Sequence, residues 1–218
     1  MKKLFILLLS IICYYQNGQA QTYTAAFVNQ AYIQLQNDTV LSDTNWIGKI
    51  IPLKIPFNVR ISSLSLNRIY IHVDGQILRK STVGGFVSYS NLISAFGNCA
   101  LRQMKGEISK ISYVTEGVSP NRTVKIQFKN AGFVGDEKHE DKINFQVWLY
   151  ESGKQYEIRF GPKSLQPMRA LNGAYGPLLG IGSRFLHGTP GTPSALSSQS
   201  YGFNGIPDSS FTYRFTRP

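Results

Sequence analysis

The feature that most constrains this chain is an alternation of apolar and polar residues with a period of two. Between positions 66 and 73, Ile69, Ile71 and Val73 alternate with polar or amphipathic side chains. The same pattern returns in four later segments, at 123–129, 143–150, 155–160 and 211–215. Because successive side chains of a strand point to opposite faces, the pattern predicts strands that each bury one face.

Turn and helix signals agree with an all-β chain. Asp74-Gly75 is a dipeptide typical of tight hairpins. Helical spacing occurs only at 91–104, where Gly97 interrupts it, so we expect at most one short helix. Residues 177–205 are rich in Gly, Ser and Pro and are expected to form a long surface excursion. We predict a single antiparallel β-sandwich with jelly-roll-like topology over residues 21–218.

The N-terminus has the three parts of a secretory signal peptide. Two lysines precede an apolar run at 4–13, and the small residues Gly18 and Ala20 follow at cleavage-site positions. Cys13 raises the alternative of a lipid anchor, but bulky isoleucines precede it where small residues are required. We expect residues 1–20 to be removed. The mature chain would have no transmembrane span and would act in the periplasm, at the outer-membrane surface or outside the cell.

Cleavage would leave one cysteine, Cys99, and therefore no internal disulfide. Catalytic cysteines need a basic, accessible setting, and no histidine lies near Cys99 in the sequence. We interpret this residue as part of the core.

The order of the predicted strands resembles a known family. The matching segments are 51–57, 69–77, 111–117, 120–130, 144–151 and 206–218, and the most distinctive are Pro-Asn-Arg at 120–122 and Phe-Gln-x-x-Leu-Tyr-Glu at 145–151. They resemble the secreted, nidogen-like β-sandwich domains of exported surface proteins of Bacteroidota. The resemblance implies a fold and an exported location, and it supplies no catalytic residues. We interpret the motifs as marks of the fold, with Arg122 and Glu151 pairing near strand ends.

Basic and aromatic residues share the predicted outward positions of three strands. The candidate ligand-binding residues are Lys125, Gln127, Lys129, Gln146, Trp148, Tyr150 and Arg159. Cations and aromatic rings on one face suit an anionic polysaccharide or an acidic envelope protein. The alternative is that Trp148 and Tyr150 pack beneath the excursion at 177–205. Nucleic acid is not expected, because no recognised binding motif is present.

Four carboxylates gather within six positions, namely Asp136, Glu137, Glu140 and Asp141. Hard cations such as calcium need six to eight oxygen ligands, so these residues are weak metal candidates. The cluster lies between two strands and lacks the spacing of a known calcium loop. A solvated hairpin tip is favoured, and we expect neither a metal nor another cofactor.

Catalytic signatures are missing from the sequence. It has no Gly-x-Ser-x-Gly motif, and its three histidines show no recognisable triad order. The sequence therefore favours a non-catalytic exported module for binding or structure, acting in cell-surface adhesion or recognition of acidic glycans. Two alternatives stay open: a glycan hydrolase on a sandwich fold, and a subunit of an outer-membrane export or motility complex.

Overall fold

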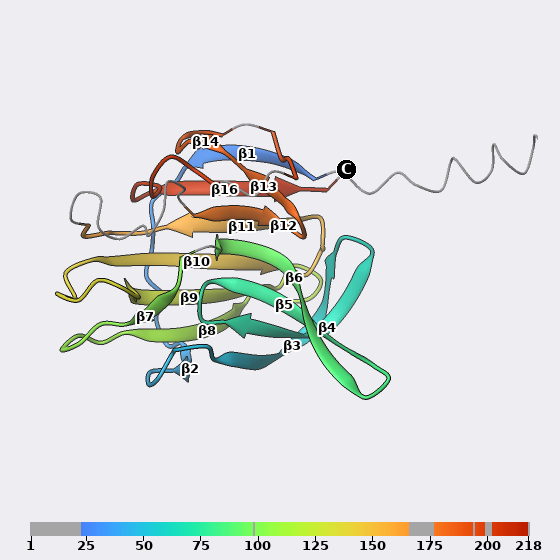
Figure 1. The fold of residues 1–218 in the computed structure, drawn as a ribbon. Coiled ribbons are helices and arrows are strands. Elements are labelled where there is room, and N and C mark those ends of the chain that lie inside the picture. The colour runs from blue at the N-terminus through green and yellow to red at the C-terminus, as the bar shows by residue number, and fades with distance from the viewer. Residues whose placement is uncertain (1–22, 98, 166–176, 194, 199–201, 218) are drawn as a thin grey trace, which may run out of the picture.

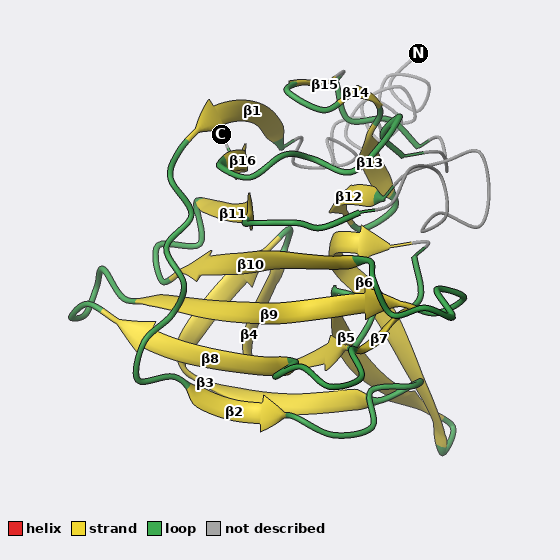
Figure 2. Cartoon of the chain, turned by 90° about the vertical axis from the view of Figure 1, so that its left-hand side faces the viewer, coloured by secondary structure: helices red, strands yellow, loops and turns green. Residues whose placement is uncertain are grey.

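A computed structural model describes residues 23–97, 99–165, 177–193, 195–198 and 202–217. These residues form two antiparallel sheets that face each other across one hydrophobic core, and they include no helix (Figures 1 and 2). The predicted β-sandwich is confirmed. The predicted signal peptide, including Cys13, lies outside the described residues.

The larger sheet has eight strands in the order β1-β16-β11-β10-β9-β8-β2, with β7 paired to β9. Its strands are β1 Thr24–Asn29, β2 Thr39–Ser42, β7 Leu101–Gln103, β8 Lys110–Glu116, β9 Thr123–Phe133, β10 Lys142–Tyr150, β11 Gln155–Phe160 and β16 Phe211–Thr216. Strands β8 to β11 follow one another in sequence and in space, so hairpins build the centre of this sheet.

The smaller sheet has six strands in the order β13-β12-β6-β5-β4-β3. Its strands are β3 Ile50–Ile61, β4 Leu64–His72, β5 Gln76–Val83, β6 Phe86–Gly97, β12 Leu178–Ile181 and β13 Arg184–Leu186. A separate two-strand ribbon pairs β14 Gly188–Thr189 with β15 Thr192–Pro193. Strands β3 to β6 again form successive hairpins.

The inward rows are those that the alternation predicted. Ile69 and Ile71 of β4 are fully buried, as are Val124 and Ile126 of β9. Aromatic rings join the two sheets: the ring of Phe96 on β6 stacks on that of Phe145 on β10, with centroids 5.6 Å apart. The sheets are therefore held together by apolar and aromatic packing across the interior.

Cys99 lies in this core with 6% of its surface exposed. Burial raises the pKa of its thiol to about 12, so the sulfur stays protonated and unreactive at neutral pH. The interpretation of Cys99 as a core residue is confirmed.

The sequence allowed at most one short helix, at 91–104, and none forms among the described residues, since 91–97 belong to β6 and 101–103 to β7. Residues 92–97 are buried on both faces of β6, so their apolar character is continuous and hides the strand period. The described part of 177–205 is more than a surface excursion, because β12 and β13 extend the six-stranded sheet and Leu179 and Leu186 are fully buried.

Candidate binding faces

The sequence-predicted residues meet on the outer face of the eight-stranded sheet. The strand register places Lys125 of β9 opposite Trp148 of β10, and Gln127 opposite Gln146. It also places Gln146 opposite Arg159 of β11. We call the seven predicted residues the Trp148 ladder: Lys125, Gln127, Lys129, Gln146, Trp148, Tyr150 and Arg159.

The indole of Trp148 already has partners on the protein. The Arg159 guanidinium carbon lies 3.3 Å from the ring centroid and the Lys125 ammonium lies 3.9 Å from it. The indole N–H donates to the side-chain oxygen of Gln146 over 2.8 Å. Cation–π contacts of this kind stabilise the ring and the cations together. The ring therefore packs against residues of the protein itself, and its face is not free to stack on a ligand.

Carboxylates pair with two of the three ladder cations, Arg159 and Lys125. Glu157 has no exposed surface, and its carboxylate accepts hydrogen bonds from Arg159 Nε over 2.8 Å and from Arg214 Nε over 2.7 Å. The Lys125 ammonium lies 2.5 Å from the carboxylate of Glu116. Paired cations attract an external anion less, so little positive charge remains on this face.

A crossing segment covers part of the ladder. Residues 30–38 run from β1 to β2 over the outside of the eight-stranded sheet (Figure 2). The Gln127 side-chain oxygen accepts hydrogen bonds from the Leu35 amide over 2.9 Å and from the Tyr32 hydroxyl over 3.2 Å. The Gln146 amide donates to the Ile33 carbonyl over 2.9 Å. The N-terminal crossing segment thus covers Gln127 and Gln146 of the ladder.

The ladder is consequently only partly accessible. Gln127 and Gln146 have no exposed surface and Arg159 retains 7%. Lys125, Lys129, Trp148 and Tyr150 are half-buried. Burial is the main cause that raises the pKa of the Tyr150 hydroxyl above its ordinary value. The sequence correctly placed these residues together, and the structure adds that internal contacts use most of their polar atoms.

The acidic cluster at 136–141 is built as a turn. The Asp136 side chain accepts a hydrogen bond from the Asp141 amide over 2.9 Å, and both residues are buried. Burial is the largest single effect on the pKa of Asp136 and would raise it. Hydrogen bonds from several backbone N–H groups together outweigh burial, so the pKa lies below its ordinary value. Within the described ranges, no three acidic, histidine or cysteine side chains are placed to share a metal ion. Glu137 and Glu140 point to solvent.

A second basic face, which the sequence analysis did not single out, lies on the six-stranded sheet. It comprises Lys54, Arg68, Tyr70, Lys80 and Tyr89, and we call it the basic-tyrosine face. Arg79 alternates with Lys80 along β5, so its side chain lies on the other side of the sheet. The two tyrosine rings meet edge to face with centroids 5.4 Å apart. Among the described residues, none of the three cations of this face forms an ion pair.

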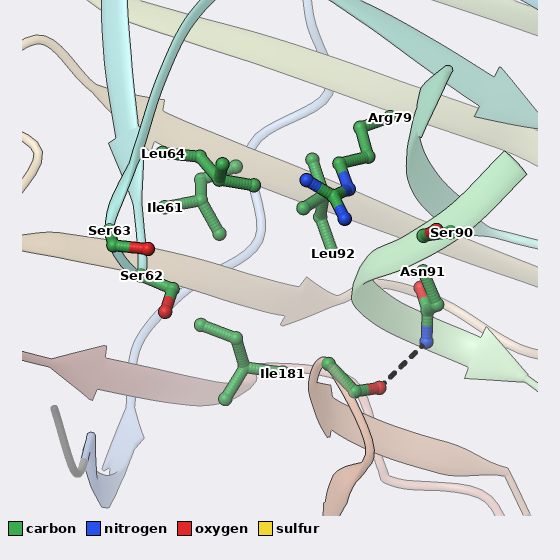
Figure 3. A pocket seen from close by; sticks show the side chains of 10 residues that line it. Ile61, Ser62, Ser63, Leu64, Arg79, Ser90, Asn91, Leu92 and Ile181 are labelled. Carbon is green, nitrogen blue, oxygen red and sulfur yellow. Dashed lines mark hydrogen bonds between the residues drawn. The ribbon is translucent and has the colours of Figure 1, made fainter. Parts of the chain in front are cut away.

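Two hollows adjoin this face. A groove of about 430 Å³ is lined by Asn58, Ser65, Leu66, Asn67, Arg68, Tyr70, Arg79 and Lys80. A smaller pocket of about 270 Å³ lies beside it, and Arg79 lines both hollows. Figure 3 shows Arg79 and Asn91 in this pocket together with apolar side chains of β3 and β12. The Asn91 amide nitrogen donates to the Gly182 carbonyl over 3.3 Å, and its buried oxygen has no partner among the described residues.

Comparison with known proteins assigns a family. A family model described as NIDO related matches residues 22–217. The chain belongs to the NIDO-related family. The nidogen-like resemblance is therefore confirmed. No curated protein and no solved structure matches this NIDO-related chain. Within the described ranges, it contains no helix that could cross a lipid bilayer.

The distinctive motifs of this NIDO-related chain meet in one structural contact. The Arg122 guanidinium donates to the Glu151 carboxylate over 2.8 Å and 2.6 Å, and the Arg122 amide donates to the same group over 3.1 Å. Arg122 also lies 5.0 Å from the ring centroid of Phe57 on the opposite sheet. The predicted pair thus forms, and it lies at a junction between the two sheets.

A sequence signal for the basic-tyrosine face did exist. Between Asp43 and Glu107 the NIDO-related chain has eight lysines and arginines but a single acidic residue, Asp74. This segment supplies β3 to β6 in full, so their outer face has almost no acidic side chain available to neutralise it. Charge counted over a whole sheet indicates the face, whereas charge counted strand by strand does not.

Proposed function

We propose that this NIDO-related chain is a non-catalytic recognition module that binds an acidic polysaccharide through the basic-tyrosine face. The observation that carries the proposal is the set of three cations on one face of the sheet, Lys54, Arg68 and Lys80, with no acidic partner among the described residues. Cations that the protein leaves unneutralised produce a positive potential, which attracts a polyanion. The module acts outside the cytoplasm, which the N-terminal signal pattern supports.

The geometry of the face suits a sugar polymer. Tyr70 and Tyr89 provide aromatic surface beside the cations, and sugar rings stack on such surface while their carboxylates or sulfates meet Lys54, Arg68 and Lys80. The groove is open to solvent, and Arg79 lines both the groove and the smaller pocket. A chain of several acidic sugars therefore fits this surface better than a compact small molecule does.

The carboxylates support a role without catalysis. A glycosidase needs a carboxylic acid with a raised pKa beside a second carboxylate. The Arg122 side chain instead lowers the pKa of Glu151 to about 2, so that group is ionised and paired at neutral pH. Glu107, Glu116 and Glu157 are likewise paired with lysine or arginine. No cofactor enters this proposal.

The direct test is binding to polygalacturonate, a carboxylated polymer, with uncharged dextran as the negative control. We expect saturable binding that weakens as salt rises, because salt screens exposed charges over about 10 Å at 0.1 M. The variant K54A/R68A/K80A should bind on the order of 100-fold more weakly, at roughly 1 kcal/mol for each cation facing an anionic surface. Isothermal titration calorimetry measures the dissociation constants of wild type and variant.

The matched control removes three cations from the other side of the molecule. Lys105, Lys129 and Lys138 have no ion-pair partner among the described residues, so K105A/K129A/K138A changes the net charge equally. It should keep most of the affinity. Equal losses of affinity in the two variants would show that binding depends on net charge and not on this face. Loss of binding only when Lys125, Lys129 and Trp148 are replaced together would move the site to the Trp148 ladder.

A further inference from the structure

The β5–β6 hairpin extends away from the body of the sandwich and ends in a tight turn (Figure 1). The turn consists of Gly84 and Gly85, whose φ angles are 57° and 82°. Positive φ at both central residues is the requirement of a two-residue type I′ turn, which glycine meets without strain. The hairpin therefore has a narrow tip in which neither turn residue has a side chain.

Large apolar side chains flank this turn. Val83 is 77% exposed, Phe86 is 83% exposed and Val87 is 51% exposed. Val83 and Phe86 are directly paired across the strands, so their side chains lie on the same side of the hairpin. The exposed apolar residues elsewhere in the described chain, such as Ile47, Ile108 and Val118, come from separate loops. Clustered exposed apolar surface of this kind marks an interaction site.

Charge and tyrosine flank the apolar tip at a defined distance. Lys80 pairs with Tyr89, three residue pairs behind Val83 and Phe86. Strands rise by about 3.4 Å per residue, which places the Lys80–Tyr89 pair about 10 Å behind the tip. No residue of β5, the turn or β6 is acidic. The hairpin thus has an apolar end, then a tyrosine, and then unneutralised cations.

We propose that the β5–β6 hairpin tip inserts into an anionic lipid surface. Interfacial segments bury their apolar face about 5–10 Å into the boundary between headgroups and acyl chains. Insertion of Val83, Phe86 and Val87 to that depth leaves Lys80 and Tyr89 among the headgroups. Tyrosine is enriched at this level of a membrane, and lysine is attracted there by anionic lipid.

A second copy of the chain is a poorer occupant for this tip. Each copy has a formal net charge of +11, and the strands behind the tip have cations without ion-pair partners among the described residues. Two copies meeting at their tips would bring like charges together, which opposes the contact. An anionic lipid surface provides both the apolar layer and the complementary charge. This inference is independent of the polysaccharide proposal, which uses other variants and another ligand.

The test uses the full chain, vesicles of phosphatidylcholine with phosphatidylglycerol, and vesicles of phosphatidylcholine alone. Wild type should sediment with the anionic vesicles, and F86S should do so at least tenfold less, since a buried Phe contributes about 1.5–3 kcal/mol. In F86W, the new indole should shift its emission to the blue when anionic vesicles are added. Phe86 is exposed, so neither substitution should alter folding.

The control is I108S, which removes an equally exposed apolar residue from a loop of the other sheet. It should bind anionic vesicles like wild type. The proposal is overturned if F86S binds like wild type or if F86W emission does not respond to vesicles. It is also overturned if wild type ignores both kinds of vesicle and instead self-associates in a way that F86S abolishes, because the tip would then contact a second copy.

Discussion

Glu157 has no exposed surface, yet three N–H groups from two arginines donate to its carboxylate. One of those arginines, Arg159, is itself buried against Trp148, so the glutamate neutralises a cation that could not be hydrated in place. This arrangement explains why the outer face of β10 and β11 tolerates a buried arginine. It also makes Glu157 the residue on which the Trp148 ladder most depends.

Replacement of Glu157 by Gln should destabilise the protein by about 3 kcal/mol, because it leaves the buried Arg159 charge without its counter-ion. Urea unfolding followed by far-UV circular dichroism measures the change. Glu107→Gln is the matched control, since Glu107 and Lys142 form a partly exposed pair and exposed pairs contribute about 0–1 kcal/mol. Coincident unfolding of the two variants would show that the buried carboxylate has no special role.

At the scale of elements, the crossing segment at 30–38 is attached to the sheet by hydrogen bonds to four side chains, those of Gln127, Gln146, Lys110 and Ser112. The Gln127 oxygen accepts hydrogen bonds from the Leu35 amide, the Tyr32 hydroxyl and the Gln146 amide. Its own amide nitrogen is buried without a partner among the described residues. Two of the segment's bonds to the sheet, those from Tyr32 and Leu35, therefore depend on one oxygen.

Gln127→Ala should loosen the crossing segment around Tyr32 and Leu35 while leaving the sandwich folded. Loss of the acceptor leaves the buried Leu35 N–H unsatisfied, at a cost of about 1–3 kcal/mol. Hydrogen exchange read by mass spectrometry should show faster exchange at 30–38 and unchanged exchange in β9 and β10. Gln155→Ala, at a half-buried position on the neighbouring β11, should leave both regions as in wild type. Unchanged exchange at 30–38 in Gln127→Ala would refute this attachment.

The strands that the sequence predicted well are those with one apolar face and one polar face. In β9, for example, Val124, Ile126 and Phe128 alternate with polar residues, and these three apolar side chains are the ones that face the core. The end of β6 is buried on both faces, so its apolar and polar residues do not alternate, which is why a helix seemed possible there. The crossing segment was missed for another reason, since its bonds join residues more than 90 positions apart.

Charge separates the two sheets when the molecule is considered whole. On the eight-stranded sheet Glu116 and Glu157 pair with Lys125 and Arg159, while strands β3 to β6 contain no acidic residue at all. The sequence correctly brought the ladder residues together, because strand alternation fixes which side chains share a face. It could not reveal which cations are neutralised, since that depends on register and on side chains from other strands. Accessibility, rather than residue type, therefore distinguishes the two basic faces.

The measurement that tests the central claim most directly is a map of amide chemical shifts during titration of isotopically labelled protein with polygalacturonate. Binding at the basic-tyrosine face predicts saturable shifts concentrated in β3 to β6, strongest around Arg68, Arg79 and Lys80 and reversed by added salt. Shifts confined to β8 to β11 around Trp148, or no saturable shifts in any strand, would contradict the claim.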